Sequence, residues 1–280
     1  MRILCLHGYG TSPSVMEYQL SALKKQADPS WGFFFMAGEV ECPPAPGIGD
    51  KFPGPYLCYT SRFDPDSMDD VHELIDETIQ DYGPFDGALG FSQGASVIMS
   101  YLLQRRAVES DQPLPVRFAV FCSSTVPLAS HAGYCRDVLG SLSAEDERRI
   151  RSCQDDAITQ LPHRSSLAIS VLNASVDATV NVTRHPRAFF LNRPLAEVPC
   201  VLHPDLFDSR LSIPTLHVRS TNDFPGLEDC SAFMQAFCDS QKTRSCNHTA
   251  GHDIPRSMLE ARQMLLGMEW VVSQSQVPTL

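Results

Sequence analysis

The stretch Gly90-Phe91-Ser92-Gln93-Gly94 limits the folds open to this chain more than any other part of the sequence. A short apolar run at residues 86–91 precedes the serine and has the length of a buried strand. Apolar residues at helical spacing follow it directly: Ala95, Ile98, Met99, Leu102 and Leu103. A strand, a glycine-flanked serine and a helix in immediate succession are typical of a nucleophile elbow, a strained turn that exposes the serine hydroxyl. The sequence therefore predicts Ser92 as a nucleophile. The alternative is an ordinary turn whose serine only caps the helix.

The rest of the chain alternates between apolar runs of strand length and segments with helical spacing. Strands are expected at residues 2–6, 33–37, 86–91, 116–122, 214–219 and 244–249. Besides the helix after Ser92, helices are expected at residues 14–26, 66–82, 231–238 and 255–272, the last with Pro255 in its first turn. The proline- and glycine-rich residues 41–55 are expected to form a loop. This alternation predicts an α/β fold, with a mostly parallel sheet and helices on both faces.

One α/β domain is expected to span residues 1–280, with residues from about 130 to 208 forming an irregular insertion. Ser143-Ala144-Glu145-Asp146 has the pattern of a capping box that opens a helix toward Leu161. The apolar pieces that follow, at residues 167–172, 188–191 and 198–202, show no clear period. We interpret the insertion as a lid over an aliphatic substrate chain, with three substrate-binding residues: Phe189, Phe190 and Leu191. The alternative is that this apolar patch is ordinary core.

Two later residues have the right types and positions to activate the serine. A serine hydroxyl is a weak nucleophile, so a nearby base must take its proton as it attacks. In hydrolases with a nucleophile elbow, the acid and then the histidine follow the serine along the chain. Asp223 stands where the strand at residues 214–219 runs into a polar loop, and His252 lies between the last strand and the closing helix. We therefore expect His252 to act as the base and Asp223 to orient it.

Other carboxylates and histidines compete for these two roles: Asp177, Asp205, Asp208, Asp229, His203, His217 and His248. His248 stands within the strand pattern, and Asp253 follows the predicted base too directly to be its acid. For Asp223 the alternative role is that of a turn residue, and for His252 that of a helix cap. The chain-order argument favours Asp223 and His252.

The oxygen that becomes negatively charged during acyl transfer needs hydrogen-bond donors placed in advance, usually two backbone amides. The residue after the nucleophile, Gln93, is expected to supply one of them. The loop His7-Gly8-Tyr9-Gly10 follows the first strand and is expected to supply the other, from Tyr9 or alternatively from Gly10. Because His7 precedes the nucleophile, we expect it to brace this loop and not to act as the base.

The composition argues against several kinds of partner. The net charge is −11 without a run of lysine or arginine, so no nucleic-acid or anionic-membrane partner is expected. The 10 cysteines include no Cys-x-x-Cys pair and are typical of buried thiols in a reducing compartment, so no disulfide framework, metal site or cofactor is expected. No secretory leader and no apolar stretch of about 18 residues is present, which predicts a cytoplasmic protein that does not span a membrane.

Several sequence blocks occur in a characteristic order: Leu4-Cys5-Leu6-His7-Gly8-Tyr9, Gly83-Pro84-Phe85-Asp86-Gly87, Gly90-Phe91-Ser92-Gln93-Gly94-Ala95, Pro214-Thr215-Leu216-His217-Val218 and Gly251-His252-Asp253-Ile254-Pro255. Together they resemble the family of serine hydrolases typified by the yeast FSH proteins, which includes the human ovarian-cancer-associated homologue and many fungal biosynthetic thioesterases. The resemblance covers residues 1–122 and 213–270. It implies an α/β-hydrolase fold and a Ser92–Asp223–His252 triad that acts on esters or thioesters.

Fungal relatives of this kind release polyketide chains from the acyl carrier protein of a synthase, by hydrolysis or by lactone closure. The chain departs from the family at residues 130–208, which are longer and less family-like, and at Ser220, where many relatives have glycine. Neither departure removes a predicted catalytic residue. The expected function is covalent acyl transfer through Ser92, with an acyl carrier protein as the expected partner. The alternatives are a carboxylesterase for small esters and a hydrolase-fold receptor with little turnover.

Overall fold

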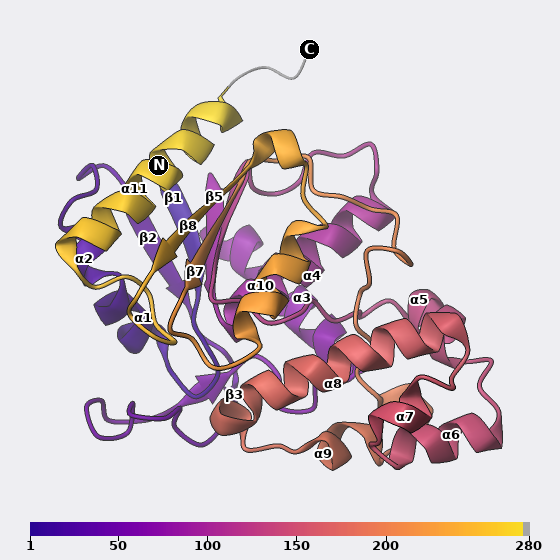
Figure 1. The fold of residues 1–280 in the computed structure, drawn as a ribbon. Coiled ribbons are helices and arrows are strands. Elements are labelled where there is room, and N and C mark those ends of the chain that lie inside the picture. The colour runs from indigo at the N-terminus through magenta and orange to yellow at the C-terminus, as the bar shows by residue number, and fades with distance from the viewer. Residues whose placement is uncertain (277–280) are drawn as a thin grey trace.

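The computed structural model describes residues 1–276 and is built around one parallel sheet (Figure 1). Its six strands stand in the order β2-β1-β5-β6-β7-β8. Their bounds are β1 (Arg2–Leu6), β2 (Gly32–Met36), β5 (Gly87–Phe91), β6 (Phe118–Cys122), β7 (Thr215–Ser220) and β8 (Thr243–His248). All neighbouring strands in it pair in parallel. The central strands β5 and β6 are buried at every residue, which explains why they appear in the sequence as unbroken apolar runs.

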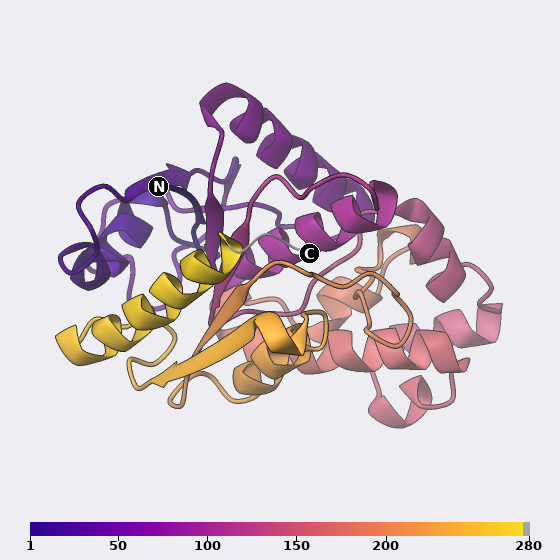
Figure 2. The ribbon, with the colours of Figure 1, turned by 90° about the horizontal axis from the view of Figure 1, so that it is seen from above.

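Helices cover both faces of the sheet, as predicted. One face carries α1 (Pro13–Gln19), α2 (Ser21–Lys24) and α11 (Met258–Ser275), and the other carries α3 (Pro65–Tyr82), α4 (Gln93–Val108) and α10 (Leu227–Gln235). Figure 2 shows α11 and α1 on the side of the sheet opposite α3 and α4. Alternate residues of β1 enter the two apolar clusters, Ile3 and Cys5 on one face and Leu4 and Leu6 on the other. The predicted α/β fold is confirmed.

Between β6 and β7 the chain forms a group of helices and not the predicted irregular segment. They are α5 (Ala132–Leu139), α6 (Ala144–Arg151), α7 (Asp155–Ile158), α8 (His163–Thr183), α9 (Arg187–Leu191) and the 3₁₀ helix η1 (Leu195–Glu197). Helix α8 contacts α5, α7, α9 and α10, so its buried residues lie on several faces and produce no single apolar stripe. Figure 1 shows α6, α7 and α9 on the outer side of α8. We call residues 130–208 the cap and the remaining described residues the platform.

Two smaller expectations need correction, whereas the predicted proline-rich loop forms. The helix predicted to run from Ser143 toward Leu161 is divided into α6 and α7, because Cys153 adopts a left-handed backbone with φ 59°. The capping box itself forms, between Ser143 and Asp146. The last helix begins at Met258 with Ser257 as its cap, so Pro255 lies before the helix. The proline-rich loop is bracketed by an antiparallel pair, β3 (Val40–Glu41) and β4 (Leu57–Cys58).

Among the helices of residues 1–276, none has the length and apolar character needed to cross a lipid bilayer.

Candidate active site

Ser92 occupies a strained turn between β5 and α4, with φ 52° and ψ −115°. Residues other than glycine rarely adopt this backbone conformation, and holding it costs about 1–3 kcal/mol. Two glycines make the turn possible. A Cβ on Gly94 would lie 2.2 Å from the Leu6 carbonyl oxygen, and one on Gly90 would lie 2.5 Å from the Ala95 amide nitrogen. The strand-to-helix turn therefore has the geometry that the sequence predicts.

His252 lies between Ser92 and Asp223, within hydrogen-bond distance of each. His252 Nε2 is 3.0 Å from Ser92 Oγ, and His252 Nδ1 is 2.8 Å from Asp223 Oδ1. With its proton on Nδ1, the imidazole donates to the carboxylate and leaves Nε2 free to accept from the serine hydroxyl. The three residues follow β5, β7 and β8, whose carboxyl ends meet at one edge of the sheet.

The Asp223 carboxylate is held in its charged form although only 4% of its side chain is exposed. Burial acts to raise the pKa of this carboxyl, but the hydrogen bond from His252, the attraction to that ring when it is protonated and the Phe224 amide together outweigh burial and lower the pKa below its ordinary value. The backbone amide of Phe224 also donates to Asp223 Oδ1, at 2.8 Å. A charged carboxylate in this position fixes the tautomer of the imidazole and stabilises the imidazolium that forms when it takes a proton.

The rival residues are engaged elsewhere. Asp253 pairs with Arg256 and accepts from Gln19. Asp177 pairs with Arg187 in the cap, and the imidazole of His217 lies in the interior, 3.6 Å from the Cys238 sulfur. His248 is buried at the end of β8, where its Nδ1 accepts from the Ala250 amide at 3.2 Å. Asp205 lies beside His203. None of these contacts involves Ser92.

Two backbone amides near Ser92 are available for an oxyanion. A Cβ on Gly8 would lie 3.3 Å from Ser92 Cβ, so the loop that contains Tyr9 runs directly beside the serine. Within residues 1–276 the structure gives no intramolecular acceptor to the amides of Tyr9 and Gln93. The amide of Gly10 donates to the Leu57 carbonyl at 3.0 Å, so it is already occupied. This difference favours Tyr9 over Gly10 as the second donor.

Both ring nitrogens of His7 bond to neighbouring segments. Its Nδ1–H donates to the Gly8 carbonyl at 2.8 Å, and its Nε2 accepts from the Gly38 amide at 3.0 Å. Burial lowers the pKa of His7 to about 4, so the ring is neutral at pH 7. These contacts match the predicted bracing of the loop and leave no nitrogen free to act on Ser92.

Sequence reasoning missed the role of the Gln93 side chain. Its Oε1 accepts from the Tyr59 amide at 3.0 Å, and its Nε2 donates to the Thr60 carbonyl at 2.7 Å. The Tyr59 hydroxyl in turn accepts from the His7 amide at 2.9 Å. One side chain thus links the nucleophile turn to the loop after β4. No local pattern in the sequence indicates these contacts, because they join segments about 30 to 50 residues apart.

A mainly apolar cavity opens from Ser92 under the cap. We call it the acyl cavity, and its walls include Tyr9, Thr60, Phe63, Met68, Gln93, Ser96, Val97, Thr125, Val126, Leu128, Leu172, Ser175, Val176, Thr179, Val182, Thr183, Phe190 and Pro199. Residues from one face of α8 form its roof, at spacings of three and four residues. The cavity therefore lies between the platform and the cap.

Of the three predicted substrate-binding residues, Phe190 alone is found in the wall of the acyl cavity. Phe189 stacks on His185 with ring centroids 3.9 Å apart, and the guanidinium of Arg193 lies over its other face. Leu191 is fully packed in the interior. These two residues lie outside the cavity wall because 187–191 form a helix, in which consecutive side chains point in different directions.

A second, smaller cavity opens on the other side of Ser92, beside His252. Its walls include Tyr9, Thr11, Gln19, Ala45, Pro46, Ile48, Phe91, Val182 and Phe224. Tyr9, Ser92 and Val182 belong to the walls of both cavities. The serine hydroxyl therefore lies at the junction of two spaces, one for each side of a bond that it could attack.

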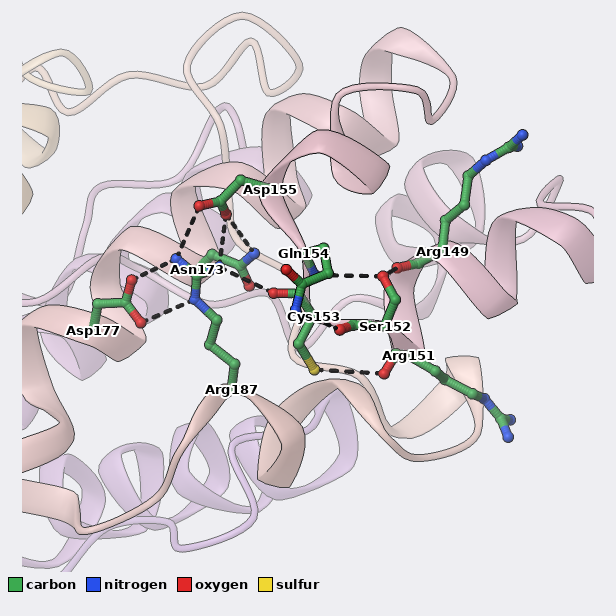
Figure 3. Close-up of polar contacts among 9 residues, drawn as sticks. All are labelled: Arg149, Arg151, Ser152, Cys153, Gln154, Asp155, Asn173, Asp177 and Arg187. Carbon is green, nitrogen blue, oxygen red and sulfur yellow. Dashed lines mark hydrogen bonds and ion pairs between the residues drawn. The ribbon is translucent and has the colours of Figure 1, made fainter.

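The cap helices are joined by the guanidinium of Arg187, which projects from α9 (Figure 3). It forms a two-point ion pair with Asp177 of α8, with Nε 2.9 Å from Oδ1. It also pairs with Asp155 of α7 at 2.6 Å and donates to the Cys153 carbonyl at 3.1 Å. We call this set the Arg187 clamp. It fixes α9, which carries Phe190, against the roof helix α8.

All ten cysteines lie in the described part of the chain and are free thiols. Within residues 1–276 no group of three or more histidine, cysteine, aspartate or glutamate side chains is arranged to hold a metal ion.

A parallel sheet with a serine at its strand-to-helix turn, and with an aspartate and a histidine on later loops of the same edge, defines the class of α/β-hydrolases. Residues 1–264 match the family described as "Serine hydrolase (FSH1)". The chain belongs to this serine hydrolase family, as the sequence resemblance predicts.

Two curated relatives are similar over most of their length. A serine hydrolase, cnsH, of Penicillium expansum is 52% identical over 239 residues, which cover 85% of this chain and 98% of the relative. An esterase, alnB, of Emericella nidulans is 37% identical over 280 residues, 98% of each chain. Among solved structures, the esterase RhEst1 from Rhodococcus sp. has a TM-score of 0.51 at 15% identity and covers 98% of this chain and 90% of its own. That likeness concerns the fold alone.

Proposed function

We propose that this hydrolase transfers acyl groups through a covalent ester on Ser92, and that its substrate is an acyl thioester carried by an acyl carrier protein. The observation that carries the proposal is the 3.0 Å contact between His252 Nε2 and Ser92 Oγ at the junction of two cavities. The acyl chain would occupy the acyl cavity, and the carrier arm would leave through the smaller one. The family's fungal members that release polyketides support the choice of a thioester.

In the proposed reaction, Ser92 Oγ attacks the acyl carbonyl carbon as His252 Nε2 takes its proton. The oxyanion accepts hydrogen bonds from the amides of Tyr9 and Gln93. The carbon–sulfur bond then breaks, and His252 gives its proton to the leaving thiol. A water molecule, or a hydroxyl of the acyl chain itself, attacks the acyl-enzyme with His252 again as base. The product is a free acid in the first case and a lactone in the second.

The test begins with labelling and intact-mass measurement. A fluorophosphonate should add one equivalent to the wild type and none to Ser92→Ala. An acyl N-acetylcysteamine thioester should then produce an acylated Ser92 and turn over faster than p-nitrophenyl butyrate. A protein that takes up neither reagent would be the hydrolase-fold receptor, and the proposal would fail.

The second candidate is a carboxylesterase for small esters, and the relative from Emericella nidulans, named an esterase, favours it. High turnover of p-nitrophenyl butyrate without a preference for thioesters would identify this activity and remove the carrier protein from the proposal. A carrier-bound substrate gives the sharper comparison. If the carrier protein is a partner, kcat/KM should be higher for the carrier-bound thioester than for its N-acetylcysteamine analogue.

A further inference from the structure

The acyl cavity carries hydroxyl groups along its walls although most of its lining is apolar. Besides Ser92, the hydroxyl-bearing residues in its walls are Tyr9, Thr60, Ser96, Thr125, Ser175, Thr179 and Thr183. Ser175, Thr179 and Thr183 follow one another at intervals of four residues on α8, so they lie on one face of the helix. At about 1.5 Å per residue, this stripe is about 12 Å long. It begins near the nucleophile, because Val182 lines both cavities beside Ser92.

Several of these hydroxyl groups have already used their single hydrogen. Thr179 Oγ1 donates to the Ser175 carbonyl at 2.8 Å, and Thr183 Oγ1 donates to the Thr179 carbonyl at 3.3 Å. On the platform side, Ser96 Oγ donates to the Val126 carbonyl at 2.6 Å. Thr60 Oγ1 donates to Ser67 Oγ at 2.9 Å. A hydroxyl group has one hydrogen and two lone pairs, so none of these four groups has a hydrogen left for a ligand. Thr60 and Thr183 each already accept one backbone amide, from Phe63 at 2.9 Å and from His185 at 3.3 Å, and keep one lone pair.

On α8, Thr179 and Thr183 therefore present hydrogen-bond acceptors and no donor to the cavity. Elsewhere in the walls, the hydroxyl groups of Tyr9, Thr125 and Ser175 can donate as well as accept. A plain alkyl chain in the cavity would remove water from the lone pairs without replacing it, which carries a free-energy cost. A keto group placed beside Thr179 or Thr183 would bring its own lone pairs against theirs. A hydroxyl group on the chain would donate to them and avoid both costs.

From this arrangement we infer that the acyl chain of the substrate bears at least one hydroxyl group, which donates to the threonine oxygens of α8. The inference rests on the proposed function, because it assigns the cavity to the acyl part of the substrate. It adds the chemistry of that part: a reduced, hydroxylated chain is bound in preference to an alkyl or keto chain of the same length. The same hydroxyl groups are the ones available for lactone closure on Ser92.

The first test uses the wild-type enzyme and needs no variant. N-acetylcysteamine thioesters of one chain length are prepared as alkyl, keto and hydroxyl forms, with the oxygen moved one carbon at a time. We expect the best hydroxyl form to exceed the alkyl form in kcat/KM by about tenfold or more, the effect of one well-placed hydrogen bond. An alkyl form that is as fast as every hydroxyl form would overturn the inference.

The second test removes one acceptor without changing the side-chain shape. Thr179→Val should lower the ratio of kcat/KM for the hydroxyl form to kcat/KM for the alkyl form by about tenfold. Thr159→Val is the matched control, because Thr159 Oγ1 donates to the Asp156 carbonyl at 2.8 Å in an exposed turn outside the cavity. It should leave both substrates unaffected. Equal losses for the two substrates in Thr179→Val would contradict a specific contact.

Intact-mass measurement separates the two levels of the argument. If every thioester acylates Ser92 at the same rate, the hydroxyl inference fails and the proposed function stands. If none acylates Ser92, the proposed function fails and the inference fails with it.

Discussion

The platform and the cap are both packed around buried apolar side chains, but their elements are joined in different ways. The strands at the centre of the platform are buried at every position, and the histidines inside it are neutral because burial lowers their pKa. The cap contains none of the six sheet strands, and two ion pairs with exposed carboxylates join its helices: Arg187–Asp155 and Arg187–Asp177. The residues proposed for chemistry all come from the platform, and the roof of the acyl cavity comes from the cap. The comparison suggests that changes to the platform alter the reaction itself, whereas changes to the cap alter which chain is accepted.

The largest expected effect tests the platform's side of this comparison. Asp223→Asn keeps the shape of the side chain but removes the charge that fixes the His252 tautomer, so kcat should fall by about 10³- to 10⁴-fold. The loss should be the same for short and long acyl groups, because Asp223 does not line the acyl cavity. Steady-state kinetics with an acetyl and a long-chain ester measures both. Asp253→Asn, one residue beyond His252, is the control and should retain activity within about threefold. A loss that depended on the length of the acyl chain would contradict the division of roles between the platform and the cap.

The next effect concerns stability and pH. Burial lowers the pKa of His72 to about 4 in the folded protein, from an ordinary value of 6.5. The unfolded chain therefore binds a proton that the folded protein does not, between pH 6.5 and 4, and the free energy of unfolding must fall as the pH falls through this range. At pH 4.5 the loss from this histidine is about 2–3 kcal/mol. Urea unfolding of wild type and His72→Gln at pH 7 and pH 4.5 measures it. The variant should lose less stability than the wild type, and parallel losses would show that His72 is not responsible.

The smallest effect is expected in the cap. Arg187→Gln removes the clamp that joins α7, α8 and α9, but exposed ion pairs contribute only about 0–1 kcal/mol each, so the unfolding midpoint should move little. The position of Phe190 over the acyl cavity should become less well fixed. We expect kcat/KM for a long acyl chain to fall by about threefold to tenfold, with an acetyl ester unaffected. High salt should reproduce part of this change in the wild type.

Arg148→Gln is the matched control for the clamp, because Arg148 pairs with Glu145 inside α6 and joins no second element. It should leave both substrates unaffected. If Arg187→Gln slowed the acetyl ester as much as the long chain, the cap would be part of the catalytic machinery and the division between the two regions would fail.

The sequence predicts the platform well because its signals are local or follow chain order. The Ser92 turn needs only adjacent residues, and Asp223 and His252 follow from the order of strands. The choice between Tyr9 and Gly10 depends on the Leu57 carbonyl, which lies far away in the sequence and so leaves no local pattern. In the cap, local signals are misleading, because α8 is buried on several sides and shows no single apolar face. The sequence also cannot tell that 187–191 is helical, so it does not show that Phe190 lines the acyl cavity while Phe189 and Leu191 lie outside its wall.

Val182, near the end of α8, borders both spaces that meet at Ser92. A smaller residue at this position would thin the partition between the two cavities and enlarge both of them. Selection for a substrate with a bulkier acyl group would then also weaken the discrimination between water, an alcohol and a thiol as the group that attacks the acyl-enzyme. In this enzyme, the preference for an acyl group and the preference for the group that attacks the acyl-enzyme would therefore evolve together, through the side chain of one residue.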